Sequence, residues 1–369
     1  MITNLGRKEE IYYWNFIKTI AICLVVYCHL PLLNPSWYNN YSQLLTFIAV
    51  PLFFMVNGAA LFSHAFDLKK HTHKMVHLFL ITRVWRAIYL AFAVWRGMVD
   101  VAALSGVKMV TYFLGDSIKG VPSGPLWFIR SLIACYILFP VLKHAFDSQQ
   151  TRRYLEILCV AMIVLMVLRQ ECLLWQEVLT EKQIISQDTA VSLKFLMQYN
   201  PVGSWAVLYF ILGGLVHQRY YIEQKGGSRR KNVLFILAFL LASVWFFCIK
   251  GLIAGFSGTV FNDFSKYGID GCYQSMAVLI MSGSFFMLSL NGNSKMKPFQ
   301  NVIRLVGRNT LTIYFVHYMG VYLLKDSIPY FQNHAGIFCN GLKTIILIGV
   351  CLVVDFVIKK VPGVRKILI

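Results

Sequence analysis

Apolar runs long enough to cross a lipid bilayer recur along the whole chain. A transmembrane helix needs about 20 predominantly apolar residues, and ten segments of that kind alternate with polar connections. The pattern predicts an all-α integral membrane protein, a bundle of about ten transmembrane helices. The predicted spans are residues 11–33, 44–62, 76–96, 126–145, 154–174, 203–218, 232–252, 271–290, 303–324 and 337–358. The longest outer connections, 97–125 and 175–202, could form short interfacial helices or a lid.

The composition excludes an ordinary soluble protein. Hydrophobic residues make up 57% of the 369 positions, and charged residues make up only 14%, well below the usual quarter for a soluble domain. In water such a chain would expose more apolar surface than folded proteins tolerate. The formal net charge of +19 raises the question of nucleic acid, but basic residues in cytoplasmic loops are the better explanation.

The distribution of Lys and Arg predicts the orientation of the chain. With the N-terminus in the cytoplasm, twenty basic residues fall in the inner segments and eight in the outer ones, and every inner loop carries several. Cytoplasmic loops of membrane proteins are enriched in Lys and Arg. Both termini are therefore expected in the cytoplasm. Because ten spans leave no room for a large soluble domain, we expect residues 1–369 to form one transmembrane domain.

The first apolar segment carries two polar side chains that need an explanation inside a membrane. It reads WNFIKTIAICLVVYCHLPLL, and Lys18 and His29 are eleven residues apart. Eleven residues rotate an α-helix by about 1100°, which is three turns and roughly 20°, so both side chains share one helix face. His titrates near neutrality and suits a general base. The alternative is that Lys18 snorkels to the inner interface and His29 lies in the outer one.

A pair of arginines lies in the inner half of the third segment, which reads LFLITRVWRAIYLAF. Arg83 and Arg86 are three residues apart and are therefore neighbours on one helix face. Guanidinium groups bind phosphate through two parallel hydrogen bonds, so these residues are candidates for holding an anionic ligand. Snorkelling of both side chains to the inner headgroups is the alternative.

Two further pairs of residues lie towards the outer side of predicted spans. Trp127 and Arg130 are near the start of the fourth segment, where anchoring at the interface is the alternative to a functional role. Tyr314 and His317 in the ninth segment are spaced i and i+3, which places a hydroxyl beside an imidazole. For these two residues, hydrogen bonding between helices is the alternative.

Signatures of a metal site are missing from the sequence. Its nine Cys are irregularly spaced and form no CxxC pair, so neither a zinc site nor a disulfide scaffold is predicted. No carboxylate occupies the middle of a predicted span, although proton-coupled transporters commonly use acids buried in the membrane. His29 likewise has no clear acidic partner in the sequence.

Together these segments resemble the membrane acyltransferase family 3, which includes surface-polysaccharide O-acyltransferases. Lys18 and His29 are similar to the family's basic residue followed by ten positions and His, with Lys where Arg is commoner. TRVWR at 82–86 resembles its paired-arginine segment, and VPLFFMVNGAALF at 50–62 its second segment, with Asn57 where Ser is commoner. GPLWFIRSLIACYILFPVL, YFILGGL and VGRNTLTIYFVH resemble its fourth, sixth and ninth segments. The likeness spans nearly the whole chain.

The resemblance implies that an acyl group, most simply acetyl, moves from cytoplasmic acyl-CoA to a hydroxyl of an extracytoplasmic glycan or glycolipid. It also implies a location in the bacterial cytoplasmic membrane. A transporter or flippase of a polysaccharide precursor is the alternative function, and a role in assembly alone is a second one.

Three groups of residues are expected to carry the reaction. The first holds the catalytic residues, with His29 as general base. The second binds acyl-CoA, and the third binds the sugar or stabilises the developing oxyanion. The catalytic group is His29 and Lys18. The group that binds acyl-CoA is Lys18, Arg83 and Arg86. The group on the acceptor side is Trp127, Arg130, Tyr314 and His317.

Overall fold

The computed structural model places the chain in helices and short connections. It describes residues 12–31, 36–100, 102, 104–189, 192, 204–222, 229–254, 272–290, 299–328, 330–331 and 334–368. Within these residues no strand occurs, so the predicted all-α class is confirmed for the described part of the chain. The predicted outer connection 175–202 lies partly outside the described residues.

The helices follow one another along the chain with few long described connections. In order they are α1 (Tyr12–Cys28), α2 (Trp37–Leu45), η1 (Thr46–Ile48), α3 (Ala49–Phe62), α4 (Leu68–Trp95), α5 (Gly106–Leu114), η2 (Gly124–Leu126), α6 (Trp127–Asp147), α7 (Gln149–Met162), η3 (Ile163–Leu168), α8 (Arg169–Glu181), α10 (Trp205–Val216), η4 (His217–Ile222), α11 (Arg229–Ala254), α13 (Met276–Leu290), α14 (Gln300–Arg308), α15 (Thr310–Ser327), α17 (Ile337–Lys360) and α18 (Pro362–Leu368).

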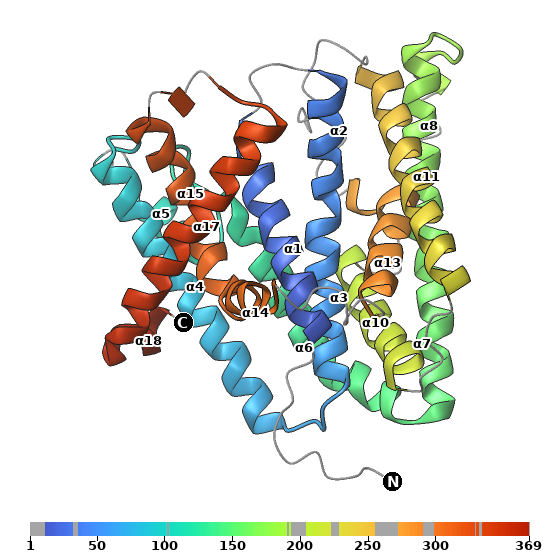
Figure 1. Cartoon of the computed structure of the whole chain (residues 1–369), viewed down its shortest axis with the longest axis horizontal. Helices are drawn as coiled ribbons and strands as arrows, with labels where there is room; N and C mark the ends of the chain where they lie inside the picture. Colours follow the sequence, from blue (N-terminus) through green and yellow to red (C-terminus); the bar gives the residue numbers. More distant parts are fainter. Residues whose placement is uncertain are drawn as a thin grey trace.

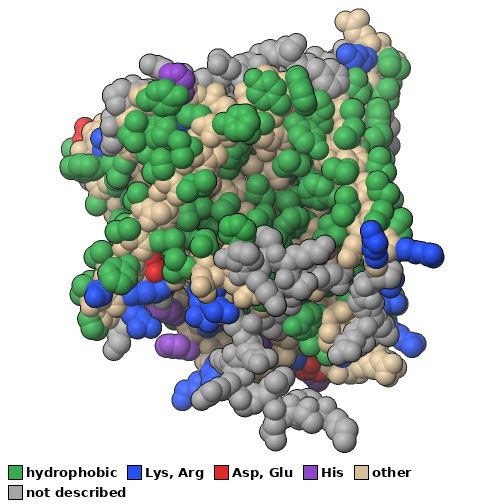
Figure 2. Space-filling model, in the orientation of Figure 1, with side chains coloured by type: hydrophobic (Ala, Val, Ile, Leu, Met, Phe, Trp, Pro, Cys, Tyr) green, Lys and Arg blue, Asp and Glu red, His purple; other side chains and the backbone are tan. Residues whose placement is uncertain are grey.

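The chain is a multi-pass membrane protein. Among the described residues, six helical stretches are long and apolar enough to cross a bilayer, and three shorter apolar helices accompany them. The long stretches are α2 to α3, α4, η2 to α6, α7 to α8, α11 and α17, and the shorter helices are α1, α13 and most of α15. Figure 2 shows apolar side chains over most of one face, with Lys and Arg gathered mainly at the lower end.

Two predicted boundaries are wrong because hydropathy does not register where a helix changes direction. The ninth span, predicted as one helix over 303–324, is split at Asn309 into α14 and α15, and Figure 1 shows α14 end-on, across the bundle. A polar cluster stabilises the break, since Asp355 accepts hydrogen bonds from Thr312 Oγ1 at 2.7 Å and from Lys359 Nζ at 2.7 Å. α1 likewise ends at Cys28, so His29 lies in the turn after it.

α1 lies inside the bundle, with α3, α14, α15 and α17 packed around it. Thr19 Oγ1 donates a hydrogen bond to the carbonyl of Ile303 at 2.9 Å. α14 crosses α1 so closely that a Cβ on Gly307 would overlap the backbone of Asn15. These contacts fix the position of the helix that leads to His29.

α3 and α10 approach each other closely because glycines replace side chains where they cross. A Cβ on Gly58 would overlap the carbonyl of Phe210, and a Cβ on Gly213 would overlap the carbonyl of Met55. Small residues allow such close approach in membrane bundles, where packing rather than the hydrophobic effect joins helices. The crossing fixes α3 and with it the continuous stretch α2 to α3, which forms one side of the cavity described below.

The Gly213→Ala substitution tests this crossing. We expect it to destabilise the protein, because the added methyl group meets backbone that cannot move aside, and overpacking costs about 1–3 kcal/mol. The matched control is Gly283→Ala in α13, where nothing lies within 4 Å of the added methyl group and Ala favours the helix. Thermal unfolding in detergent should show a lower Tm only for Gly213→Ala. Equal Tm values for both variants would contradict the close packing.

Candidate active site

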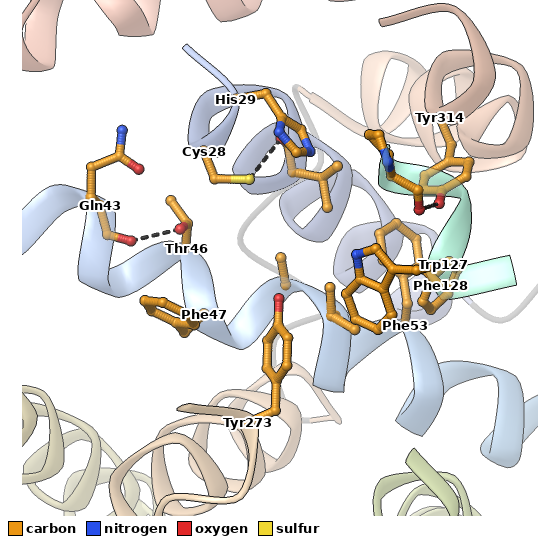
Figure 3. A pocket seen from close by; sticks show the side chains of 14 residues that line it. Cys28, His29, Gln43, Thr46, Phe47, Phe53, Trp127, Phe128, Tyr273 and Tyr314 are labelled. Atoms are coloured by element: carbon orange, nitrogen blue, oxygen red, sulfur yellow. Dashed lines mark hydrogen bonds between the residues drawn. The ribbon is translucent and has the colours of Figure 1, made fainter. Parts of the chain in front are cut away.

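A cavity of about 250 Å³ lies beside the end of α1, between the α2–α3 stretch and the start of α6 (Figure 3). Most of its walls are apolar or aromatic, which is typical of a small-molecule site with a few placed polar groups. Its lining residues are Val25, Cys28, His29, Gln43, Thr46, Phe47, Ala49, Val50, Phe53, Pro125, Trp127, Phe128, Tyr273 and Tyr314. Among its described lining residues there is one imidazole, that of His29, and no carboxylate.

His29 is held at the edge of the cavity by its backbone and by two rings of α15. Its backbone N–H donates to the carbonyl of Val26 at 3.3 Å, which continues α1 by a tight turn. Tyr318 packs edge-to-face on the imidazole with ring centroids 4.7 Å apart, and the His317 ring lies at 5.3 Å. The imidazole therefore has a defined environment on one side and the cavity on the other.

Trp127 and Tyr314, which were predicted to contact the acceptor, both line the cavity. The indole of Trp127 packs against Trp205 and Tyr273, each at a centroid distance of 5.9 Å, and Figure 3 shows its N–H edge turned towards the side on which His29 lies. The Tyr314 hydroxyl donates to the carbonyl of Pro125. That hydroxyl hydrogen is therefore committed to η2, and Tyr314 presents mainly its ring.

Gln43 is a cavity residue that the sequence analysis missed. Its side chain is 3% exposed, and its Nε2 is buried with no hydrogen-bond partner among the described residues. An unpaired buried amide donor is costly, which makes Gln43 a candidate for binding a ligand oxygen. The only signal for it was the polar run NNYSQ at 39–43, directly before the predicted second span.

The other predicted site residues lie outside the cavity wall. His317 is fully buried behind His29. Lys18 is partly buried on α1, three turns before His29. The remaining three are the arginines Arg83, Arg86 and Arg130.

These three arginines meet at the C-terminal end of α5, whereas the sequence analysis assigned Arg83 and Arg86 to the inner half of their span and Arg130 to the outer side. Arg83 donates to the carbonyl of Phe113. Arg86 donates to the carbonyl of Gly115 at 3.0 Å, and Arg130 donates to the same carbonyl at 2.8 Å. The last carbonyls of a helix lack partners within it and carry the negative end of the helix dipole. The guanidinium groups satisfy them and so hold the loop that leads to η2 and the cavity.

A surface ion pair closes the same loop. Lys108 Nζ lies 2.6 Å from Asp116 Oδ2, with both side chains partly exposed. The hydrogen bond from Lys108, together with that from the backbone N–H of Ser117, lowers the pKa of the Asp116 carboxyl. The pair is therefore formed at neutral pH and is lost when acid protonates Asp116.

Comparison with known proteins identifies a family. The model of the acyltransferase 3 family, described as an acyltransferase domain, matches residues 11–358. Neither a curated protein nor a solved structure matches the chain.

Arg86→Gln tests the structural role of the arginine cluster. Arg86 is 3% exposed, and its loss leaves several buried carbonyls unsatisfied, each costing about 1–3 kcal/mol. We expect a lower Tm and faster proteolysis of the 97–125 segment. Arg153→Gln, which removes an exposed arginine on α7, is the control and should change neither. An Arg86→Gln protein as stable as the control would show that α5 does not depend on this guanidinium.

Proposed function

The chain belongs to the acyltransferase 3 family, and from that membership we propose that it is a membrane O-acyltransferase with acetyl-CoA as donor. The acceptor is a hydroxyl of an extracytoplasmic glycan or glycolipid. The observation that carries the proposal is the position of His29, the one imidazole in a largely apolar cavity inside the bundle. A base in such a site can act on a hydroxyl while bulk water, which would hydrolyse the thioester, is kept away.

The arrangement of charge supports transfer from the cytoplasm outwards. Lys and Arg gather mainly at one end of the molecule (Figure 2), and α1 runs away from that end towards His29 (Figure 1). We assign the basic end to the cytoplasmic side of the bacterial inner membrane, with ten spans and both termini inside. His29 then lies on the extracytoplasmic side, where a glycan acceptor is available.

The proposed acyl transfer needs one general base, which is His29. Nitrogen of His29 takes the proton of the acceptor hydroxyl while the oxygen attacks the carbonyl carbon of the thioester. The carbon–sulfur bond breaks, the ester forms, and the coenzyme A thiolate leaves and takes the proton from His29. General-base catalysis of this kind contributes about 10²- to 10⁴-fold to the rate.

Donors inside the cavity support stabilisation of the oxyanion that forms on the carbonyl. The indole N–H of Trp127 and the unpaired Nε2 of Gln43 are the donors that we assign to this role or to the acceptor oxygens. We assign Tyr314, His317 and Arg130 to the acceptor side as well, where they act through neighbouring groups rather than by touching the sugar. Tyr314 and Arg130 do so by holding η2 and α5 in place.

The cations that we assign to the acyl-CoA donor are Lys18, Arg83 and Arg86. Phosphate groups of coenzyme A are suitable ligands for guanidinium. Nε of Arg83 and Nε of Arg86 are buried and have no hydrogen-bond partner among the described residues. Each arginine has five N–H donors, and the carbonyls of α5 accept hydrogen bonds from only some of them. The remaining N–H groups support a second role for these arginines, in binding a ligand.

His29→Ala tests the proposed function directly. Washed membranes that carry the variant should transfer at least about 10²-fold less label from radiolabelled acetyl-CoA into glycan, although the variant accumulates normally. His64→Ala, which removes an exposed histidine after α3, is the control and should leave transfer unchanged. Near-normal transfer by His29→Ala would remove His29 from the mechanism. Movement of unlabelled glycan without any transfer by the unmodified protein would indicate a flippase.

A further inference from the structure

His29 does not stand alone at the cavity, because a second imidazole lies directly behind it. The rings of His29 and His317 have centroids 5.3 Å apart and are tilted by 36°. At this centroid distance, two ring nitrogens that face each other along the line between the centroids are about 3 Å apart, the length of a good hydrogen bond. The pair joins the end of α1 to α15, two elements far apart in the sequence.

The hydrogen bonds of His317 define which of its nitrogens carries hydrogen. Nδ1 lies 2.7 Å from the carbonyl of Tyr314 and 3.2 Å from that of Ile313. Carbonyls only accept, so Nδ1 is the donor, and in a neutral imidazole Nε2 is then an acceptor. This Nε2 is buried and has no hydrogen-bond partner among the described residues. His317 therefore holds a fixed, unused acceptor next to His29.

We propose that His317 is the positioning residue of His29: its Nε2 accepts the N–H of one His29 nitrogen and leaves the other nitrogen unprotonated towards the cavity. This inference rests on the proposed function. The hydrogen bond selects the tautomer and the ring orientation that a base needs, and it stabilises the imidazolium while His29 holds the proton of the acceptor. The arrangement performs the task that an aspartate performs in a serine hydrolase triad.

A neutral imidazole suits this location better than a carboxylate. His317 is fully buried among apolar and aromatic side chains, where an ionised carboxylate would have to lose its hydration at a cost of several kcal/mol. The nearby ring groups are the neutral Tyr314 and Tyr318. Asp355, a buried acid of the adjacent helix, is already paired with Lys359 and Thr312. The pairing thus explains how His29 is oriented without an acidic partner among the residues that the structure describes.

A matched pair of amide substitutions tests the proposal. In His317→Gln the amide lies where Nε2 is and can still accept from His29, whereas in His317→Asn it reaches only the Nδ1 position. The full-length protein in lipid nanodiscs would be assayed with acetyl-CoA and alkali-treated surface glycan, from which existing esters have been removed. We expect an effect of the size found for groups that orient metal-binding histidines, about 10- to 100-fold.

We expect His317→Asn to lower kcat by that factor with both KM values unchanged, and His317→Gln to retain most of the rate. Equal activity of the two variants, whether both normal or both low, would overturn the proposal. So would a raised acceptor KM at normal kcat, which would make His317 a sugar-binding residue. His29→Ala separates this inference from the proposed function: an inactive His29→Ala protein beside a fully active His317→Asn protein would refute only the pairing. An active His29→Ala protein would refute both.

Discussion

The site depends on one physical constraint: a polar group buried in a membrane bundle must find a partner inside the protein. The constraint is met most clearly at the end of α5, whose last carbonyls accept hydrogen bonds from Arg83, Arg86 and Arg130. Without these guanidinium groups, a helix end could not remain buried there. The loop that follows leads to η2 and Trp127, and the Tyr314 hydroxyl fixes the same loop from α15. Hydrogen bonds to backbone carbonyls thus hold in place the loop that carries Pro125 and Trp127 to the cavity wall.

The same rule identifies the groups that await a partner. Among the described residues, buried polar atoms without a hydrogen bond include Nε2 of Gln43 and Nε2 of His317. One lines the cavity and the other lies behind its imidazole. Most other buried polar side chains near the site are paired, so these two indicate where a substrate oxygen and the N–H of His29 belong. The proposed chemistry therefore rests on these two unpaired atoms as well as on the shape of the cavity.

Much of the fold could be predicted from hydropathy, since each predicted span overlaps a described helix. The sequence also indicated His29, Trp127 and Tyr314, because polar or amphipathic side chains in apolar runs are unusual. It could not indicate the break at Asn309, which depends on a contact with the distant α17. Nor could it pair Arg86 with α5 or His317 with His29, because these contacts join segments that only the tertiary structure brings together.

Whether acyl transfer takes place beside His29 can be tested by a structure of the protein in lipid nanodiscs with an acetyl-CoA analogue whose sulfur is replaced by a methylene group. We expect the acetyl group inside the 250 Å³ cavity, with space for an acceptor oxygen roughly 3–3.5 Å from its carbonyl carbon and within hydrogen-bond reach of His29. We also expect the nucleotide to lie towards the basic end of the bundle. An acetyl group bound elsewhere, with the cavity beside His29 filled by lipid, would rule out this cavity as the active site.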